Sequence, residues 1–188
     1  MEQQETICLV IAKIIRERSE ISKLIQFEEI LTELTRQGLL KSEVVDERSH
    51  FEAILREAVE KNKDLKGISS RDGGPYYFSA QSLSETYARI LIQKEENPLL
   101  LMAEIVRENS AIYPRPVPLD LFKKSPFDLT QEEILECLKK MGKQGEYQDI
   151  SQTNTSIGTI FLYSKRHLDS GYASMLAEWL DVGQANNP

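Results

Sequence analysis

Basic side chains gathered in short runs are the residues of this sequence whose type and spacing could do chemistry. Ammonium and guanidinium groups neutralise phosphate charge, so a surface that gathers several of them could bind a nucleic-acid backbone. One run is SKRH, residues 164–167, which precedes a predicted helix, and another group ends the predicted helix near residue 143. The candidate residues for a nucleic-acid or partner surface are Arg71, Lys139, Lys140, Lys143, Lys165, Arg166 and His167.

The surroundings of these basic residues also fit an ordinary solvated surface. The helix predicted over 131–143 begins with Glu132 and Glu133 and ends with lysines, an order that complements the helix dipole. The turn at 151–159 carries no charge, and the corresponding turn of the first half has Arg71 beside Asp72. Short basic runs are weak motifs. The phosphate-binding patch and the plain surface cluster therefore both remain open.

The overall charge favours a partner other than nucleic acid. The chain has 23 basic and 30 acidic side chains, which give a net charge of -7. The excess of acid is shared, with 14 bases against 17 acids through residue 95 and 9 against 13 after it. Nucleic-acid-binding domains are usually basic on the face that they use. We therefore hold nucleic-acid binding as the alternative function, which would need a local basic face.

Catalytic and metal-binding motifs do not emerge from the spacing of reactive residues. His50 and His167 are the only histidines, and neither has a cysteine at ligand spacing or a nucleophile motif nearby. Cys8 and Cys137 fall inside apolar helical patterns, which indicates buried packing residues. We expect a protein that is no enzyme, without a metal, a cofactor or a small-molecule substrate.

The elements that position these residues occur twice along the chain. The stretch LVIAKIIRERS, residues 9–19, returns as LLMAEIVRENS, residues 100–110, with Leu, Ala, Ile, Arg, Glu and Ser at the same places. Three further pairs follow in the same order: 51–55 with 131–135, 65–69 with 147–151, and 77–88 with 162–173. Four collinear matches over about 85 residues indicate a duplicated domain, because solenoid repeats are much shorter.

Each copy predicts the same series of elements. A first apolar helix is followed by a second, which lies near 27–37 in copy one, ends at Gly38, and has its counterpart beginning around Pro118. The third helix packs inward through residues 51–59 in copy one, and through Ile134, Leu135, Leu138 and Met141 in copy two. Two short strands then form a hairpin, and a fourth helix follows. The strands lie at 65–69 and 76–79 in copy one, and at 147–151 and 159–164 in copy two.

Three helices, a hairpin and a trailing helix in under about 100 residues resemble the winged-helix plan. The chain is similar in this plan to tandem winged-helix proteins such as the bacterial segregation and condensation protein B. The resemblance implies an α+β, mainly α fold with two winged-helix repeats, at 1–96 and 97–182, and a disordered tail at 183–188. It rests on the order and spacing of the elements, so no functional residue is carried over from that family.

The first helices carry more apolar surface than one small domain would cover. ICLVIA, residues 7–12, and PLLLMA, residues 98–103, leave no polar side, so we expect them to pack on the other copy, a second chain or a partner, or on the fourth helix of their own copy. The join KEENP, residues 94–98, offers almost no linker and predicts a rigid pair. Trp179 could pack internally or anchor a partner.

The function expected from these patterns is a non-enzymatic interaction module that binds another protein or a second copy of itself. Its alternative is a DNA-binding transcription regulator that uses the basic residues of the second copy. No apolar run approaches the roughly 20 residues that cross a bilayer, and the chain opens with Glu2 and Glu5 in place of a leader. These features predict a cytoplasmic protein without a membrane partner.

Overall fold

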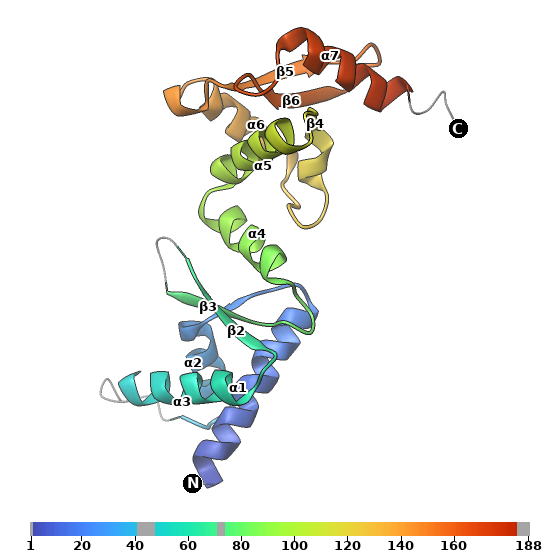
Figure 1. Cartoon of the computed structure of the whole chain (residues 1–188). Helices are drawn as coiled ribbons and strands as arrows, with labels where there is room; N and C mark the ends of the chain where they lie inside the picture. The colour runs from blue at the N-terminus through green and yellow to red at the C-terminus, as the bar shows by residue number, and fades with distance from the viewer. Residues whose placement is uncertain (1, 41–47, 71–73, 184–188) are drawn as a thin grey trace. The chain divides into compact units, whose positions relative to one another are not determined.

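The computed structural model describes residues 2–40, 48–70 and 74–183, and its chain divides into two compact units, residues 1–92 and 93–188. The fold is α+β and mainly helical, with one three-stranded sheet in each unit (Figure 1). The predicted turn with Arg71, Asp72 and Gly73 and residues 184–188 of the predicted tail at 183–188 lie outside the described residues. Within those residues, no helix is long and apolar enough to cross a membrane.

The first unit carries its short strand between its first two helices and its hairpin after the third. Its elements are α1 (Glu2–Glu20), β1 (Ile25–Gln26), α2 (Phe27–Arg36), α3 (Arg48–Lys61), β2 (Leu65–Ser69), β3 (Pro75–Ser79) and α4 (Glu85–Glu96). The antiparallel sheet has the order β1-β3-β2. Gly38, with a φ of 73°, ends α2 as predicted.

The second unit repeats this order, with a 3-10 segment where the first unit has α2. Its elements are α5 (Pro98–Ile112), β4 (Val117–Pro118), η2 (Leu119–Lys123), α6 (Gln131–Met141), η3 (Gly145–Tyr147), β5 (Ile150–Asn154), β6 (Ile160–Ser164), α7 (Ser170–Glu178) and the π-helical turn η4 (Trp179–Gly183). The sheet order is β4-β6-β5. The sheet lies between α5 and α7 (Figure 1), so β6 is buried on both faces.

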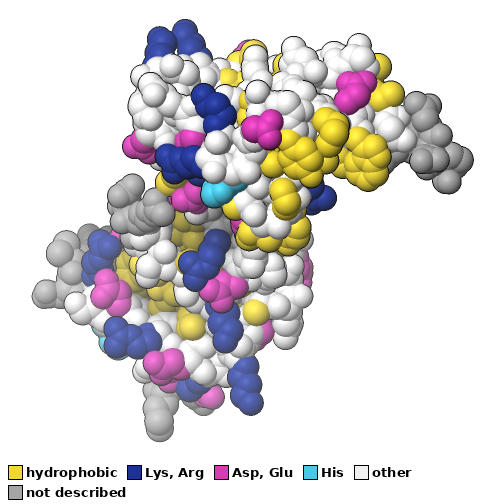
Figure 2. All heavy atoms as spheres, turned by 45° about the horizontal axis from the view of Figure 1, so that its top comes forward, with side chains coloured by type: hydrophobic (Ala, Val, Ile, Leu, Met, Phe, Trp, Pro, Cys, Tyr) yellow, Lys and Arg dark blue, Asp and Glu magenta, His cyan; other side chains and the backbone are white. Residues whose placement is uncertain are grey.

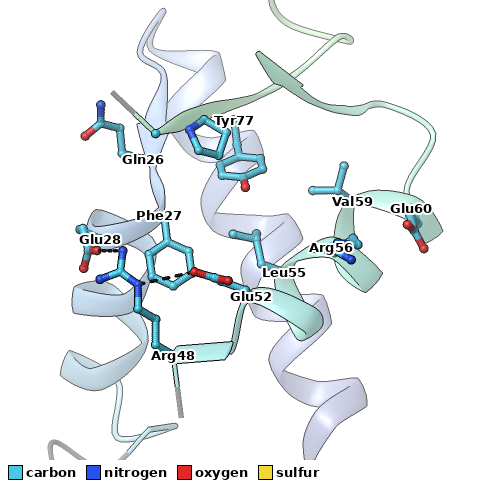
Figure 3. Close-up of a pocket in the computed structure, with 12 residues that line it drawn as sticks. Gln26, Phe27, Glu28, Arg48, Glu52, Leu55, Arg56, Val59, Glu60 and Tyr77 are labelled. Carbon is cyan, nitrogen blue, oxygen red and sulfur yellow. Dashed lines mark ion pairs between the residues drawn. The ribbon is translucent and has the colours of Figure 1, made fainter. Parts of the chain in front are cut away.

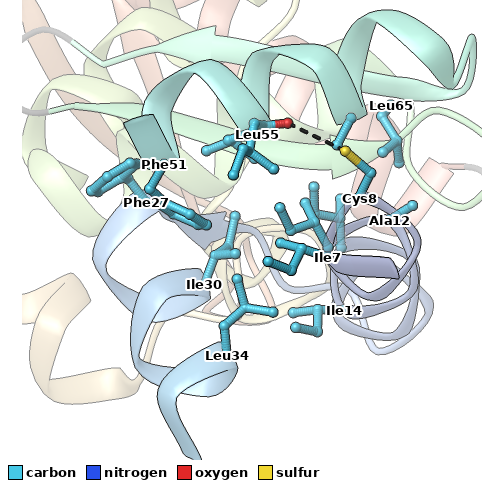
Figure 4. Packing of buried hydrophobic residues seen from close by; sticks show 14 of the residues in the cluster. Ile7, Cys8, Ala12, Ile14, Phe27, Ile30, Leu34, Phe51, Leu55 and Leu65 are labelled. Carbon is cyan, nitrogen blue, oxygen red and sulfur yellow. Dashed lines mark hydrogen bonds between the residues drawn. The ribbon is translucent and has the colours of Figure 1, made fainter. Parts of the chain in front are cut away.

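Helix α1 is the centre of the first unit's core, and its cover comes from α2, α3 and the sheet, whereas the expected cover was the other copy, a second chain, a partner or the fourth helix. Figure 4 shows Ile7 and Ile14 of α1 facing Ile30 and Leu34 of α2, while Cys8 lies against α3. Because α2, α3 and the sheet all pack on α1, the residues of several helical stripes are buried within one unit. Leu9 is the exception, with 68% of its surface exposed.

Helix α6 packs inward through all but one of the predicted residues. Ile134, Cys137 and Met141 are buried as expected and Leu138 is half-buried, but Leu135 is 53% exposed. Each residue turns the helix by about 100°, so positions 134, 137 and 141 share one stripe and position 135 points away from it. Thr130 and Glu133 form a capping box at the helix start.

The first strand of the second hairpin lies three residues later than predicted, whereas its second strand, β6, begins within one residue of the predicted start. Its first strand is β5, because the residues before it form the 3-10 turn η3. Ser164 pairs with Ile150 in this hairpin, and Ser79 pairs with Leu65 in the first. The two hairpins therefore correspond at an offset of 85 residues, whereas the sequence match of 65–69 with 147–151 gives 82.

Candidate interaction surfaces

A groove of about 640 Å³ lies on the first unit, between α3 and the end of the sheet where β1 pairs with β3. Figure 3 shows Phe27, Leu55, Val59 and Tyr77 pointing into it from both sides. Phe27 is fixed from below, because its ring packs on that of Phe51 with centroids 5.1 Å apart. The groove therefore has an apolar floor that belongs to the core of its unit.

Charges on the rim of this groove are nearly balanced. The Arg48 guanidinium lies 5.1 Å from the centre of the Phe27 ring and pairs with Glu28 at 2.8 Å and Glu52 at 3.5 Å (Figure 3). Arg56 and Glu60, further along the rim, form no ion pair with any residue that the structure describes. Among the described residues, the rim thus offers one free base and one free acid, not a cluster of cations.

Tyr77 gives the groove a polar group that stays neutral. Its side chain is half-buried, and burial raises the pKa of the phenol above its usual value. The hydroxyl points into the groove in Figure 3 and has no hydrogen-bond partner among the described residues. It can therefore donate a hydrogen bond to an acceptor on an incoming molecule.

The basic residues of the second unit lie on two separate elements. Lys139 and Lys140 end α6 and Lys143 follows it, while Lys165, Arg166 and His167 form the turn after β6. All six are exposed, but Lys140 pairs with Glu136 at 2.8 Å and Arg166 lies 3.5 Å from Asp149. Among the described residues, no hydrogen bond or ion pair joins the group at 139–143 to the turn at 165–167. Basic and acidic side chains are also intermixed on the face shown in Figure 2.

The tip of the second hairpin is held by carboxylates, which the sequence did not reveal. Asp181 accepts a hydrogen bond of 2.7 Å from the Thr155 hydroxyl, and Glu178 accepts one of 2.8 Å from the Ser156 backbone N–H and a second from its hydroxyl. A wing that touched DNA would present cations to phosphate. This tip instead lies against two carboxylates, whose negative charges would repel the phosphates of DNA.

A polar network recurs at the other end of each hairpin. In the first unit Asp64 accepts two hydrogen bonds from the Arg16 guanidinium, at 2.9 and 2.8 Å, and one of 2.9 Å from the Ser79 hydroxyl. The Ser79 backbone N–H in turn donates to the Ser19 hydroxyl at 2.8 Å. The network ties the end of α1 to both strands of the hairpin.

The second unit has the same network with the corresponding residues. Arg107 donates to Asp149 at 2.9 and 2.6 Å, the Ser164 hydroxyl donates at 2.7 Å, and the Ser164 N–H donates to Ser110 at 3.0 Å. The sequence match pairs the arginines and serines but misses the aspartates, because it sets the first strands of the two hairpins three residues out of register. In both units the arginine, chiefly through these hydrogen bonds, lowers the pKa of the aspartate to about 2.

The part of the chain that the structure describes shows no candidate metal site. The described residues contain no cluster of three His, Cys, Asp or Glu side chains that could hold an ion. Cys8 and Cys137 are free and buried. The Cys8 thiol lies 3.8 Å from the Ile54 carbonyl oxygen, so it packs between α1 and α3 as the sequence indicated.

Comparison with known proteins finds similarity to one family and one bacterial protein. Residues 96–185 match the model of the YdhW C-terminal domain family, and they make up nearly all of the second unit. The chain is 32% identical, over 139 residues, to the Uncharacterized protein YdhW of Escherichia coli (strain K12). The aligned part is 72% of this chain and spans 65% of the length of that protein. No solved structure matches.

Proposed function

We propose that the chain is a tandem winged-helix interaction module, and that its first unit binds a protein partner in the groove between α3 and β3. Two features support the winged-helix assignment. The first is the order helix, short strand, helix, helix, hairpin and helix. The second is the sheet order β1-β3-β2, in which the short strand joins the hairpin. The order recurs in the second unit, with a 3-10 segment as its second helix.

The single observation that carries the protein-binding function is the chemistry of this groove. In a DNA-binding winged helix the third helix and the wing form the basic reading surface. Here that place has a floor of Phe27, Leu55 and Val59 and a rim on which Arg48 is neutralised by two acids. Apolar and aromatic side chains with few free charges characterise the centre of protein interfaces.

DNA binding through the second unit is the second candidate. The observation that favours it is the exposure of Lys139, Lys143 and Lys165, which form no ion pairs with residues that the structure describes. Three features weigh against it: the acidic first turn of α6, the pairing of Arg166 with Asp149, and the hairpin tip held by carboxylates. Binding to a phosphate backbone falls steeply with salt, so low salt gives this candidate its best chance.

The experiment compares proteins captured from a bacterial extract by immobilised wild type, Val59→Glu and Leu9→Glu. Both variants place a carboxylate on a helix of the first unit, but Val59 lines the groove and Leu9 lies exposed on α1. We expect a partner that is retained by wild type and Leu9→Glu and lost by Val59→Glu. Circular dichroism melts establish that both variants are folded.

Two results would overturn the proposal. Equal capture by all three proteins would mean that the groove is not the binding surface. Binding of a random DNA duplex at low salt, measured by fluorescence anisotropy and abolished by Lys165→Glu with Arg166→Glu, would favour the regulator instead. The matched control for that pair is Lys123→Glu with Lys124→Glu, which removes the same charge from an exposed segment of the same unit.

A further inference from the structure

An exposed apolar stripe runs along the last helix of the second unit. Tyr172 is 43% exposed, Met175 57% and Trp179 56%. Their spacing of three and four residues places them on one face of α7 and its π-helical extension. Trp179 is therefore not an internal packing residue, and its ring is presented at the surface. We call these three residues the α7 stripe.

The helical segment that carries the α7 stripe contributes no charged side chain that is free of a hydrogen bond to its own unit. Residues 170–183 contain only two, Glu178 and Asp181, and both bond to the tip of the β5–β6 hairpin. The corresponding helix of the first unit is different, because α4 exposes Glu85 and Arg89 as an ion pair of 2.6 Å. In a chain with 28% charged residues, an exposed helical segment without a free charged side chain is unusual.

The α7 stripe is also held in place by its own unit. Asp169 caps α7 by accepting a hydrogen bond of 3.0 Å from the Tyr172 N–H, and the Ser174 and Thr153 hydroxyls lie 2.7 Å apart. The Trp179 ring lies against Gly183, where a Cβ would come within 2.9 Å of it. Binding through side chains that are already ordered costs less conformational entropy.

We propose that the α7 stripe binds the α7 stripe of a second copy of the chain, with α7 packed on α7 across a two-fold axis. In such an interface every group meets the same surface of its partner, so like charges would oppose one another. The absence of a free charged side chain on this segment weakens that repulsion. Tyr, Trp and Met are enriched at protein interfaces. The inference rests on the proposed function of protein binding and names one partner for it.

The size of the stripe indicates a weak dimer. Three large side chains on a helix of about four turns offer well below the roughly 800 Å² per partner of a standard stable interface. We therefore expect a dissociation constant on the order of 10 to 100 μM, within the range of transient assemblies.

The first test measures the mass of the full chain by analytical ultracentrifugation between about 5 and 500 μM. We expect wild type to rise from 21.5 kDa towards twice that mass, and Met175→Glu to stay monomeric over the whole range. Leu135→Glu is the matched control, because Leu135 is similarly exposed on α6 of the same unit, and this variant should associate as wild type does. Trp179 is the only tryptophan, so it alone reports tryptophan fluorescence. We expect its emission to shift to the blue with rising concentration in wild type, and to stay unchanged in Met175→Glu.

The second test is disulfide trapping. In a two-fold contact the thiols introduced by Met175→Cys face each other, and mild oxidation with diamide should link two chains. Leu135→Cys should give little linked dimer, and the native Cys8 and Cys137 are buried and contribute none. If wild type is monomeric at every concentration, the inference is refuted. The groove proposal is unaffected by this result, because the capture experiment with Val59→Glu and Leu9→Glu tests it separately. Association that Met175→Glu does not weaken, or trapping as efficient through Leu135→Cys, would assign the dimer to another surface and refute it as well.

Discussion

Arg107 donates two hydrogen bonds to Asp149, at 2.9 and 2.6 Å, and it does so in the same way as Arg16 donates to Asp64 in the first unit. In each case the aspartate directly precedes the first hairpin strand and the arginine lies in the last turns of the first helix. The pair therefore fixes where the hairpin leaves the helical core. This gives it a structural role in both units.

Removal of the second of these carboxylates should destabilise the protein strongly. The Asp149 side chain is only 7% exposed, so Asp149→Ala would leave the Arg107 guanidinium and the Ser164 hydroxyl without their shared acceptor. We expect a loss of roughly 3 kcal/mol in the free energy of unfolding, measured by urea denaturation. Asp120→Ala breaks the exposed pair with Lys123 and should cost less than about 1 kcal/mol. Equal losses in the two variants would contradict the structural role.

The same aspartates predict an acid-sensitive stability. Their pKa is about 2 in the folded protein against a usual value of 3.8, so the ionised form is favoured by folding. The stabilisation is complete above about pH 4 and is lost as the pH falls towards about 2. We expect the melting temperature to drop over this window, and to drop less in the Asp64→Asn, Asp149→Asn double variant. An identical pH profile for the variant would show that other carboxylates control acid unfolding.

The helices were predictable from the sequence because their burial follows local spacing. Residues with partners far along the chain were not. The apolar character of Leu135 predicts a core position, although the buried stripe of Ile134 passes through Cys137. Asp149 was missed because its role appears only when the strand register is known, and Asp181 because it reaches a hairpin tip 26 residues earlier.

The carboxylates at the second hairpin should control how often its tip opens. Glu178→Gln with Asp181→Asn keeps the shape of both side chains but replaces charge-assisted hydrogen bonds by weaker neutral ones. We expect amide hydrogen exchange across residues 150–160 to quicken about fivefold to tenfold, which corresponds to roughly 1 kcal/mol. Glu132→Gln, on the exposed first turn of α6, is the control and should leave exchange in the hairpin unchanged. No change in either variant would mean that the strand pairing alone holds the tip.

The two native thiols should be almost inert while the protein is folded. Burial is the main cause that raises the pKa of both Cys8 and Cys137, and the thiolate is the form that reacts. Titration with Ellman's reagent at pH 8 should therefore give a slow reaction of wild type and a fast release of two equivalents in urea. The thiol introduced by Ile157→Cys, at an exposed position of the hairpin tip, should react at once without denaturant. If a native thiol reacts as quickly as that introduced thiol, then the helix that covers it opens readily, and α1 or α6 is less firmly packed than its burial implies.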